Sequence, residues 1–461
     1  MVLNTAEHVH FIGIGGYGMS AIARVLLEMG YRISGSDVAA QELTEKLIAK
    51  GAKVFIGHEA DHVTGADMVV YSTALSKDNV EMAAAEQLNI PILHRAEMLA
   101  KIMDLRKGIA VAGAHGKTTT SSMIAMVMEK CGADPTYIIG GEIMNVGSNA
   151  KAGKGEYVVA EADESDGSFL RYHPEIAIVT NIEADHLENY NGDFANLKAA
   201  YETFLSQIKP GGAAIVCQDD DYIQELLPKL AVRTITFGMD ERAEFRAANI
   251  MLGDRISSFD VYRGAELLGN IRLSVPGEHN VYNALAAIIT CLHAGLSFES
   301  IASAIHEFRG AKRRFQVLGE VNDVLVIDDY AHHPTEIQAT IAAARSTGKR
   351  IIAVFQPQRY SRTFFLLDQF SRAFSEADEV IITNIYSPAG EKQIEGVTSE
   401  RLVELIRVNS NSRVRHVQTK EEAQRVLAAE VASGDLVLTM GAGDIWRAAE
   451  GLVQDLKQRF T

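Results

Sequence analysis

A glycine-rich turn that runs into a lysine and three threonines is the clearest chemical feature of this sequence. An apolar run at 108–112 predicts a buried strand before the turn, and a helical pattern at Ser121–Lys130 follows it. Glycines let successive backbone N–H groups point at one anion, and a helix N-terminus adds its positive end. The residues expected to hold nucleotide phosphates or Mg2+ are Gly113, His115, Gly116, Lys117, Thr118 and Thr119.

A second glycine-rich loop lies near the start of the chain. Gly13, Gly15 and Gly18 form a G-x-G-x-x-G pattern after a predicted strand at His8–Ile14, and Asp37 lies nineteen residues after Gly18. This pattern is typical of dinucleotide binding, where a helix N-terminus holds the diphosphate and the acid bonds a ribose hydroxyl. A sugar-nucleotide diphosphate meets the same requirement. It fits better than a nicotinamide cofactor, because the chain carries another nucleotide loop further along.

Acidic residues follow two apolar runs in the middle of the chain. Tyr157–Ala160 is followed by Glu161, Asp163, Glu164, Ser165 and Asp166, and Ile176–Val179 by Thr180, Asn181, Glu183, Asp185 and His186. The carboxyl ends of parallel strands are where α/β folds bind ligands. Mg2+ prefers a few carboxylates together with phosphate oxygens, and it neutralises charge during phosphoryl transfer. The sequence therefore predicts a cation site here, with a solvated acidic loop as the simpler alternative.

Two further segments carry side chains suited to a nucleotide. Asn280 and Asn283 lie one turn apart in a predicted helix, Asn280–Ala294, so both amides can reach an adenine. A helix cap is the simpler role for Asn280. Arg314 lies in a short basic island, Phe308–Phe315, of an acidic chain, and a guanidinium there can clamp a phosphate.

The last third of the chain again places polar residues after apolar runs. The first predicted strand there is followed by Asp329 and His332, and the next by Arg359 and Arg362. A later strand leads into the loop at 386–391. Two arginines three positions apart suit an anionic or carboxylate-bearing substrate.

Length and composition indicate a globular chain of several domains. The 461 residues are too many for one ordinary core, and 47% are hydrophobic and 23% charged. The formal charge of −16 argues against a nucleic-acid or anionic-membrane surface, so any phosphate site must be local. Three cysteines without C-x-x-C spacing favour a reducing cytoplasm over a disulfide framework or zinc site. We expect no signal peptide and no membrane span.

Apolar runs alternate with amphipathic helical patterns almost from end to end, which predicts an α/β fold with mostly parallel sheets. We expect three domains. A Rossmann-like N-terminal domain would cover 1–103, a central P-loop-type ATPase domain 104–315, and a C-terminal Rossmann-like α/β domain 316–461. A monomer or a weak homodimer is expected.

In combination, the motifs resemble those of the Mur ligase family of peptidoglycan precursor synthesis, over essentially the whole chain. They are GIGGYGMS at 13–20, GAHGKTTT at 113–120, EADESD at 161–166, TNIEADH at 180–186, PGEHNVYNA at 276–284, RRF at 313–315, DDYAHHPTE at 328–336 and QPQRYSRT at 356–363. In this family the first domain binds a UDP-sugar, the central one ATP and Mg2+, and the third the amino acid. The resemblance implies a cytoplasmic ligase that uses ATP and Mg2+ to join the lactyl carboxylate of UDP-N-acetylmuramate to the amine of L-alanine, through an acyl phosphate.

The resemblance also implies roles for single residues. It gives Lys117 to the ATP phosphates, Thr118 and Glu161 to one Mg2+, His186 to the second, Asn280 and Asn283 to the adenine, Arg314 to the phosphates and Asp329 to the nucleotide. The expected catalytic set is Lys117, Glu161, His186 and Arg314. The expected substrate set is Gly15, Gly16, Tyr17, Gly18, Asp37, Ser72, His94, Asp163, Glu164, Ser165, His332, Arg359 and Arg362.

The chain departs from the family pattern at two positions. Several relatives carry a carbamylated lysine on the helix after the His186 motif; the aligned position here is Tyr201, with Lys198 one turn earlier, so a carbamate is not assigned. Gln358 stands where a histidine is common in this branch.

Three alternatives stay open. A muropeptide-recycling branch of the same family joins a ready-made tripeptide to the same UDP-sugar, although the QPQRYSRT and GAGDIW segments favour the alanine branch. A nicotinamide oxidoreductase would show NADH-linked turnover. A nucleotide-dependent regulatory switch would bind ATP without phosphate release that depends on an amino acid.

Overall fold

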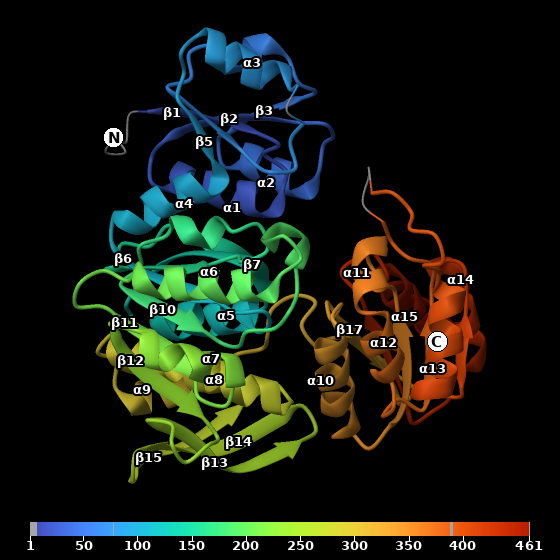
Figure 1. The fold of residues 1–461 in the computed structure, drawn as a ribbon. Coiled ribbons are helices and arrows are strands. Elements are labelled where there is room, and N and C mark those ends of the chain that lie inside the picture. Colours follow the sequence, from blue (N-terminus) through green and yellow to red (C-terminus); the bar gives the residue numbers. More distant parts are fainter. Residues whose placement is uncertain (1–6, 77, 388–390, 461) are drawn as a thin grey trace. The chain divides into compact units, whose positions relative to one another are not determined.

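The described residues form three β-sheets in successive parts of the chain (Figure 1). The computed structural model describes residues 7–76, 78–387 and 391–460. Outside these ranges lie the start of the chain, where no signal peptide is expected, and Gly390, in a predicted loop. By its internal contacts the chain divides into two compact units, the first comprising 1–249, 260–271 and 282–308, and the second 250–259, 272–281 and 309–461.

The first sheet is parallel, with the strand order β3-β2-β1-β4-β5. Its elements are β1 (His8–Ile12), α1 (Tyr17–Glu28), β2 (Arg32–Asp37), α2 (Glu42–Ala49), β3 (Lys53–Ile56), the 3-10 helix η1 (Ala60–Val63), β4 (Met68–Tyr71), α3 (Val80–Gln87), β5 (Ile92–His94) and α4 (Arg95–Asp104). Helix α3 covers one face of the sheet, and α1, α2 and α4 lie on the other (Figure 1). The strand order reverses between β1 and β4, and the carboxyl ends of strands at such a point are the usual ligand edge of an α/β sheet.

The second sheet has the order β15-β14-β13-β12-β11-β10-β6-β9-β7-β8. Its strands are β6 (Lys107–Ala112), β7 (Thr136–Ile143), β8 (Ser148–Lys151), β9 (Tyr157–Glu161), β10 (Ile176–Val179), β11 (Ala213–Cys217), β12 (Arg233–Gly238), β13 (Phe245–Gly253), β14 (Ile256–Arg263) and β15 (Glu266–Leu273). Its helices are α5 (Lys117–Lys130), α6 (Phe194–Ser206), α7 (Asp221–Leu226), α8 (Glu278–His293), α9 (Phe298–His306) and the 3-10 helices η2 (Ser168–Arg171), η3 (Leu187–Tyr190) and η4 (Leu227–Lys229).

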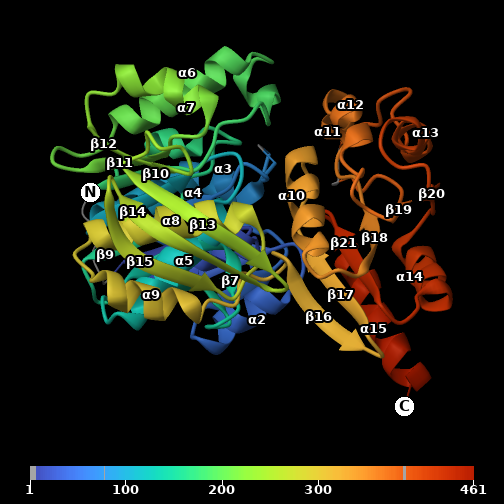
Figure 2. The ribbon, with the colours of Figure 1, turned by 90° about the horizontal axis from the view of Figure 1, so that it is seen from below.

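Strands β13, β14 and β15 extend this sheet beyond its parallel part (Figure 2). Connections of two residues join them, and such short connections link antiparallel neighbours. Their solvent-facing side chains include apolar ones, since Met251, Leu252, Ile256 and Leu267 are exposed. The sequence did not predict these strands, because their mixed faces give a weak alternation of apolar and polar residues.

The third sheet has the order β16-β17-β21-β18-β19-β20, in which only β16 pairs antiparallel with its neighbour. Its elements are β16 (Gln316–Val321), β17 (Val324–Asp329), α10 (Pro334–Arg345), β18 (Arg350–Phe355), α11 (Tyr360–Phe365), α12 (Leu367–Arg372), β19 (Glu379–Ile382), α13 (Ser399–Asn409), β20 (Val414–His416), α14 (Lys420–Glu430), β21 (Asp435–Met440) and α15 (Trp446–Phe460).

Helices cover both faces of the third sheet. Leu325 and Ile327 of β17 belong to a core with residues of α10, α12 and α13, while the alternate residues Val324 and Val326 belong to a core with residues of α14 and α15. Helix α15 packs against β16, β17 and β21 (Figure 2). Strands buried on both sides explain the continuous apolar runs of the sequence.

The predicted α/β class with mostly parallel sheets is confirmed. Three boundaries differ from the prediction. The strand predicted over His8–Ile14 ends at Ile12, since Gly13 adopts φ +78° and turns the chain. The helix predicted from Ser121 begins at Lys117, and the helix predicted over Asn280–Ala294 runs over Glu278–His293. No described helix is long and apolar enough to span a membrane.

A buried carboxylate, Glu81, ties the first sheet to the loop after β3. Ser36 Oγ donates to Glu81 at 2.5 Å, and ring nitrogens of His62 and His10 lie 2.8 and 3.3 Å from its oxygens. The Glu81 side chain is fully buried. Burial alone would raise the pKa of Glu81, but hydrogen bonds from His10, Ser36 and His62 outweigh it and lower the pKa to about 2.

We expect Glu81→Gln to lower the free energy of unfolding by about 3 kcal/mol at pH 7, because a depressed carboxyl pKa stabilises the folded state. This stabilisation is present above the unfolded pKa and is lost as the pH falls toward the folded pKa of about 2. Urea unfolding of both proteins at pH 7 and pH 3 measures the difference, which should shrink at pH 3. Glu86→Gln, at an exposed position of the same helix, is the control, and an equal loss in that variant would contradict the assignment.

Candidate active site

The phosphate loop joins β6 to α5 and adopts a backbone that its glycines permit. Gly116 precedes α5 in a left-handed conformation (φ +85°), and Gly113 has φ +132°. A Cβ at Gly113 would overlap Thr180 Oγ1, and one at Gly116 would overlap Asn283 Oδ1. Both positions therefore exclude a side chain, because Thr180 and Asn283 pack closely against the backbone of the loop.

An acid holds Lys117, the first residue of α5, inside this loop. Lys117 Nζ donates to both carboxylate oxygens of Glu164 at 2.8 Å and to the Gly113 carbonyl at 2.5 Å. The two side chains are only 16% and 4% exposed. Burial alone would lower the pKa of Lys117, but Glu164 and Asp163 outweigh it and hold the pKa above its usual value. A charged amine therefore lies at the positive end of a helix, a combination that suits an anionic ligand.

Thr118 and Glu161 bring two oxygen donors together beside the loop. Thr118 Oγ1 donates to Glu161 Oε2 at 3.2 Å, and the Gly140 N–H of β7 donates to Glu161 Oε1 at 2.6 Å. Thr119, the next residue, is buried in α5. Hydroxyl and carboxylate oxygens are the ligands that Mg2+ prefers, so this donor set fits the predicted cation.

His186, the other predicted metal ligand, lies in the turn between β10 and η3. Its backbone is left-handed (φ +55°), and its ring nitrogens lie 3.4 Å from Asp185 and 3.8 Å from Glu188. The neighbouring His186 imidazole is the main reason why the pKa of Glu188 is lowered. The role of His186 toward a second cation stays a prediction.

Residues that follow β10 brace the phosphate loop around His115. Asn181 Oδ1 accepts the His115 N–H at 2.8 Å, and Thr180 Oγ1 donates to the His115 carbonyl at 2.6 Å. His115 Nε2 lies 2.6 Å from Glu183 Oε2. Since β6 and β10 are neighbours in the sheet, these contacts join two adjacent strand ends. The sequence marked this segment as polar but did not predict that it supports the loop.

Asn283 lies on α8 against the same loop. Its Oδ1 accepts a hydrogen bond from Thr120 Oγ1 at 3.2 Å and is the nearest atom to a Cβ built at Gly116. Asn280, one turn earlier, donates through Nδ2 to the Pro276 carbonyl at 2.7 Å. Asn283 is therefore placed beside the phosphate loop, whereas Asn280 fastens the turn that starts the helix.

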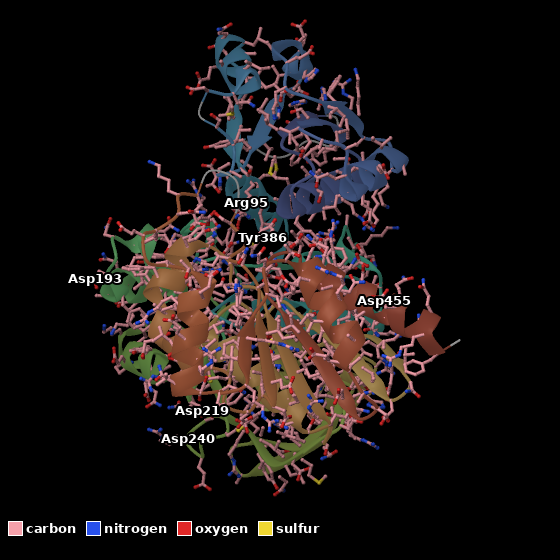
Figure 3. The ribbon with its side chains drawn as sticks, turned by 90° about the vertical axis from the view of Figure 1, so that its right-hand side faces the viewer. Arg95, Asp193, Asp219, Asp240, Tyr386 and Asp455 are labelled. Carbon is pink, nitrogen blue, oxygen red and sulfur yellow. The ribbon has the colours of Figure 1, made fainter. Side chains whose placement is uncertain are left out.

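Asp219, which follows β11, anchors α8. Tyr282 donates its hydroxyl to Asp219 Oδ2 at 2.7 Å, and Asp219 also accepts the N–H groups of Met239 and Asp240 at 2.6 and 3.1 Å. Asp219 and Asp240 lie side by side in Figure 3. This anchor fixes the position from which Asn283 reaches the loop.

The glycine-rich loop after β1 is organised around Asp37. The Asp37 carboxylate accepts the Gly15 N–H at 2.8 Å and Gln41 Nε2 at 3.3 Å. Gly16 precedes α1, whose first turn has neither a side-chain cap nor an acidic residue. The positive end of α1 thus resembles an anion site, and Asp37 supports the loop in addition to its predicted ribose contact.

Packing within the first compact unit connects the segments that carry the two glycine loops. Helix α1 packs against β7 and β8, and Arg24 Nη1 donates to Ser148 Oγ at 2.6 Å. Burial and the nearby Glu142 raise the pKa of Tyr17 to about 12, with Glu161 as a further contributor. The charge of Glu161, the predicted metal ligand, therefore acts on Tyr17 in the first loop.

Arg95, at the start of α4, is a residue that the sequence reasoning missed. Its Nη2 donates to Asp166 at 3.1 Å and lies 3.9 Å from Asp163, while a Cβ at Gly18 would lie 3.7 Å from its Nη1. Arg95 therefore joins the acidic loop after β9 to the loop after β1. Since these partners lie about seventy positions apart along the chain, the sequence carried no local signal for this contact.

Three more predicted substrate residues lie near these loops. His94 caps α4 by accepting the Ala96 N–H at 3.3 Å, and its buried Nε2 has no hydrogen-bond partner among the described residues. Burial lowers the pKa of His94. Ser72 is half-buried after β4, and the Ser165 N–H donates to Asp163 Oδ1 at 3.0 Å.

In the second compact unit, two adjacent arginines behave differently. Arg313 donates to Asp328 at 2.8 Å and to the carbonyls of Gly441 and Gly443 at 2.6 and 3.0 Å. Both guanidinium groups lie over the Tyr330 ring, 5.1 and 5.2 Å from its centroid, but the ion pair of Arg314 with Glu336 is a long 3.8 Å contact. The donors of Arg313 are used within the fold. Arg314 is therefore the guanidinium better placed for a ligand.

Asp329 lies close to Arg314 and is buried. Its carboxylate accepts the N–H groups of Phe315 and Ala331 at 2.6 and 2.7 Å. Burial raises the pKa of Asp329 to about 6, although Arg314 opposes the shift. His332 Nδ1 lies 3.2 Å from Glu336.

The predicted arginines Arg359 and Arg362 lie at the start of α11. Arg359 has φ +67°, and its N–H donates to the Tyr386 carbonyl at 2.9 Å. Arg362 Nη1 donates to Gln358 Oε1 at 3.2 Å, so the Gln358 side chain orients this arginine.

The comparisons with known proteins agree with this architecture. Family models match three consecutive stretches: "Mur ligase family, catalytic domain" at 8–107, "Mur ligase middle domain" at 111–291 and "Mur ligase, glutamate ligase domain" at 313–443. The chain belongs to the Mur ligase family.

Individual members of this family align with nearly the whole chain. UDP-N-acetylmuramate–L-alanine ligases of Symbiobacterium thermophilum and Pelotomaculum thermopropionicum are 50% and 49% identical, covering 98% and 99% of this chain and 95% and 99% of theirs. The solved UDP-N-acetylmuramate–alanine ligase of Thermotoga maritima has a TM-score of 0.82 at 28% identity, covering 98% of this chain and 99% of its own. The murein peptide ligase of Psychrobacter arcticus, at 24% identity and a TM-score of 0.70, shares the fold.

We expect Gly116→Ala to weaken ATP binding more than tenfold, because the new Cβ would displace Asn283 and strain a left-handed backbone. Titration with a fluorescent ATP analogue measures the loss. Gly147→Ala is the matched control, since Gly147 has φ +66° but open space around it. Similar weakening in both variants would mean that backbone strain alone, and not the closeness of Asn283, explains the effect.

Proposed function

We propose that this chain joins the lactyl carboxylate of UDP-N-acetylmuramate to the amine of L-alanine and hydrolyses ATP to ADP and phosphate in doing so. The observation that carries the proposal is the charged Lys117 ammonium at the positive end of α5, within the same compact unit as a second glycine-rich helix start. Two anion sites in one unit suit a nucleotide triphosphate and a sugar-nucleotide diphosphate. Relatives that are half identical over the full length carry the name of this activity.

The proposed reaction proceeds in two steps. The lactyl carboxylate attacks the γ-phosphorus of ATP, ADP leaves, and an acyl phosphate forms. The amine of L-alanine then attacks the acyl carbon, loses a proton, and phosphate leaves. Neither step needs a nucleophilic side chain, so the chain contributes positioning and charge stabilisation.

Lys117 would bind the phosphates, and Thr118 with Glu161 would hold Mg2+. When bound, this ion supplies positive charge next to the γ-phosphoryl group. His186 is proposed as the ligand of a second ion. Asn283 would contact the nucleotide from its place beside Gly116.

The first sheet would bind the UDP-sugar. The N–H groups of Tyr17 and Gly18, in the uncapped first turn of α1, suit the diphosphate, with Asp37, Ser72 and His94 nearby. Arg95 adds a positive charge beside Gly18.

Residues of the second unit are proposed to take part on the strength of the family resemblance. Arg314 and Asp329 are assigned to the nucleotide, and Arg359 and Arg362 to the amino acid or the lactyl group. We also propose a cytoplasmic location, where the free thiols of the three cysteines would persist.

A phosphate-release assay tests the proposed activity. With ATP and Mg2+, we expect phosphate release only when both UDP-N-acetylmuramate and L-alanine are present, with L-serine and glycine slower. Turnover with a muropeptide tripeptide instead of L-alanine would assign the chain to the recycling branch. Phosphate release without the sugar nucleotide would contradict the ligase.

Lys117→Ala should reduce phosphate release by about 10³-fold or more, because the charge facing the phosphates is lost. Binding of UDP-N-acetylmuramate, measured by calorimetry, should change by no more than about twofold, since it rests on a different helix start. Lys130→Ala is the control at the other end of α5, where Lys130 forms an exposed ion pair with Glu307. If sugar-nucleotide binding collapsed together with turnover, the assignment of the two loops would be wrong.

A further inference from the structure

The Lys117 ammonium has no hydrogen-bond donor left for a phosphate. A lysine ammonium has three N–H donors. Here Nζ contacts both Glu164 oxygens at 2.8 Å, the Gly113 carbonyl at 2.5 Å and the Ala114 carbonyl at 3.3 Å. A phosphate that binds Lys117 must therefore displace one of these acceptors, and Glu164 is the one among them that belongs to a side chain.

The Glu164 backbone is fixed, so only its side chain can move. The Tyr190 hydroxyl and the Gly167 N–H both donate to the Glu164 carbonyl. Glu164 is 3% exposed. A carboxylate displaced from Lys117 would therefore stay buried, and a buried charge needs another hydrogen-bond donor.

Tyr201 of α6 carries a donor, unused within the described part of the chain, at the border of the same loop. Its side chain is fully buried, and its hydroxyl has no hydrogen-bond partner among the described residues. An unsatisfied buried hydroxyl calls for an explanation. The Tyr201 ring packs against the edge of Phe169, 5.4 Å between centroids, and the Phe169 N–H donates to the Asp163 carbonyl, so Tyr201 borders the acidic loop. After burial, Glu164 is the largest cause of the raised pKa of Tyr201.

We propose that Glu164 is a two-position residue, which pairs with Lys117 in the absence of nucleotide and turns to the Tyr201 hydroxyl when a phosphate takes its place. The inference rests on the proposed ATP site. In the empty site Glu164 acts as a stand-in for the phosphate and keeps the ammonium in place. In the filled site Tyr201 satisfies the displaced carboxylate, and its own hydroxyl gains a partner.

The competing account is that Glu164 stays on Lys117 permanently and only positions it. Under that account, removing the Glu164 charge weakens ATP binding, and the Tyr201 hydroxyl is irrelevant. The two accounts therefore predict opposite directions for a substitution at Glu164 and different outcomes at Tyr201.

The test is a double-mutant cycle of ATP binding, measured by calorimetry with Mg2+ and without sugar nucleotide or amino acid. We expect Glu164→Gln to bind ATP about tenfold more tightly, because a neutral amide competes less well for Lys117. Tyr201→Phe should bind about fivefold more weakly, because the displaced carboxylate loses its donor. In the Glu164→Gln background, Tyr201→Phe should change affinity by less than about twofold, since there is no charge left to satisfy.

Asp163→Asn is the matched control, with the same charge change in the same loop but no hydrogen bond to Lys117. If Asp163→Asn tightened ATP binding as much as Glu164→Gln, the effect would be general electrostatics and the proposal would fail. It would also fail if Glu164→Gln weakened binding or if the two substitutions were additive. A crystal structure with ADP and Mg2+ gives a second readout that does not depend on the Glu164 variant folding, and it should place Glu164 within hydrogen-bond distance of the Tyr201 hydroxyl. A wild-type protein that bound no ATP would overturn the proposed function itself.

Discussion

Burial of α5 fixes the position of its positively charged end, and the site is arranged around that end. Every side chain from Thr118 to Met128 is buried, so the helix has no face along which it could shift. The polar residues of its first turns are small; Ser121 Oγ donates to the Lys117 carbonyl at 2.9 Å, and Thr120 Oγ1 donates to Asn283 at 3.2 Å. Small hydroxyl residues thus let the helix start inside the core while leaving Thr118 within reach of Glu161.

Strand β7 links the two proposed anion sites of the first unit. On one side its Gly140 N–H holds Glu161, and on the other it packs with β8 against α1, whose first turn follows the first glycine loop. A side chain at Gly140 would collide with the Glu161 carboxylate, with a Cβ 2.8 Å from Oε2. The relative placement of the two helix starts therefore depends on sheet and helix packing, which is stiffer than a flexible loop.

The sequence predicted the features that neighbouring residues determine together. The phosphate loop is one case, because its glycines, Lys117 and the helix start occupy adjacent positions. The partner of Lys117 is the opposite case. Glu164 lies forty-seven positions away, and its presence in an acidic run gave no reason to favour it over Asp163 or Asp166. Which acid reaches the ammonium depends on how β9 and the following turn place the backbone, and this tertiary information is not present in residue spacing.

The same limit explains the two asparagines and the two arginines. Spacing placed Asn280 and Asn283 on one helix face, but one closes its own turn and the other contacts the glycine loop. Arg313 and Arg314 are chemically identical neighbours, yet Asp328 and two carbonyls take the donors of the first. The buried Asp328 holds one of the two arginines within the fold, and only the structure shows that this arginine is Arg313.

The charge around Lys117 explains why a cation is needed for the proposed chemistry. Glu161, Asp163 and Glu164 all act electrostatically on this one ammonium, so the empty site is acidic even with Lys117 charged. The chain as a whole carries a formal charge of −16, so long-range attraction does not bring a polyphosphate to it. Favourable binding therefore requires positive charge between phosphate and carboxylate oxygens. In the proposed site the helix end, the ammonium and a divalent cation at Thr118 and Glu161 would supply that charge together, and the acidic loop would then favour a metal-bound nucleotide over a free one.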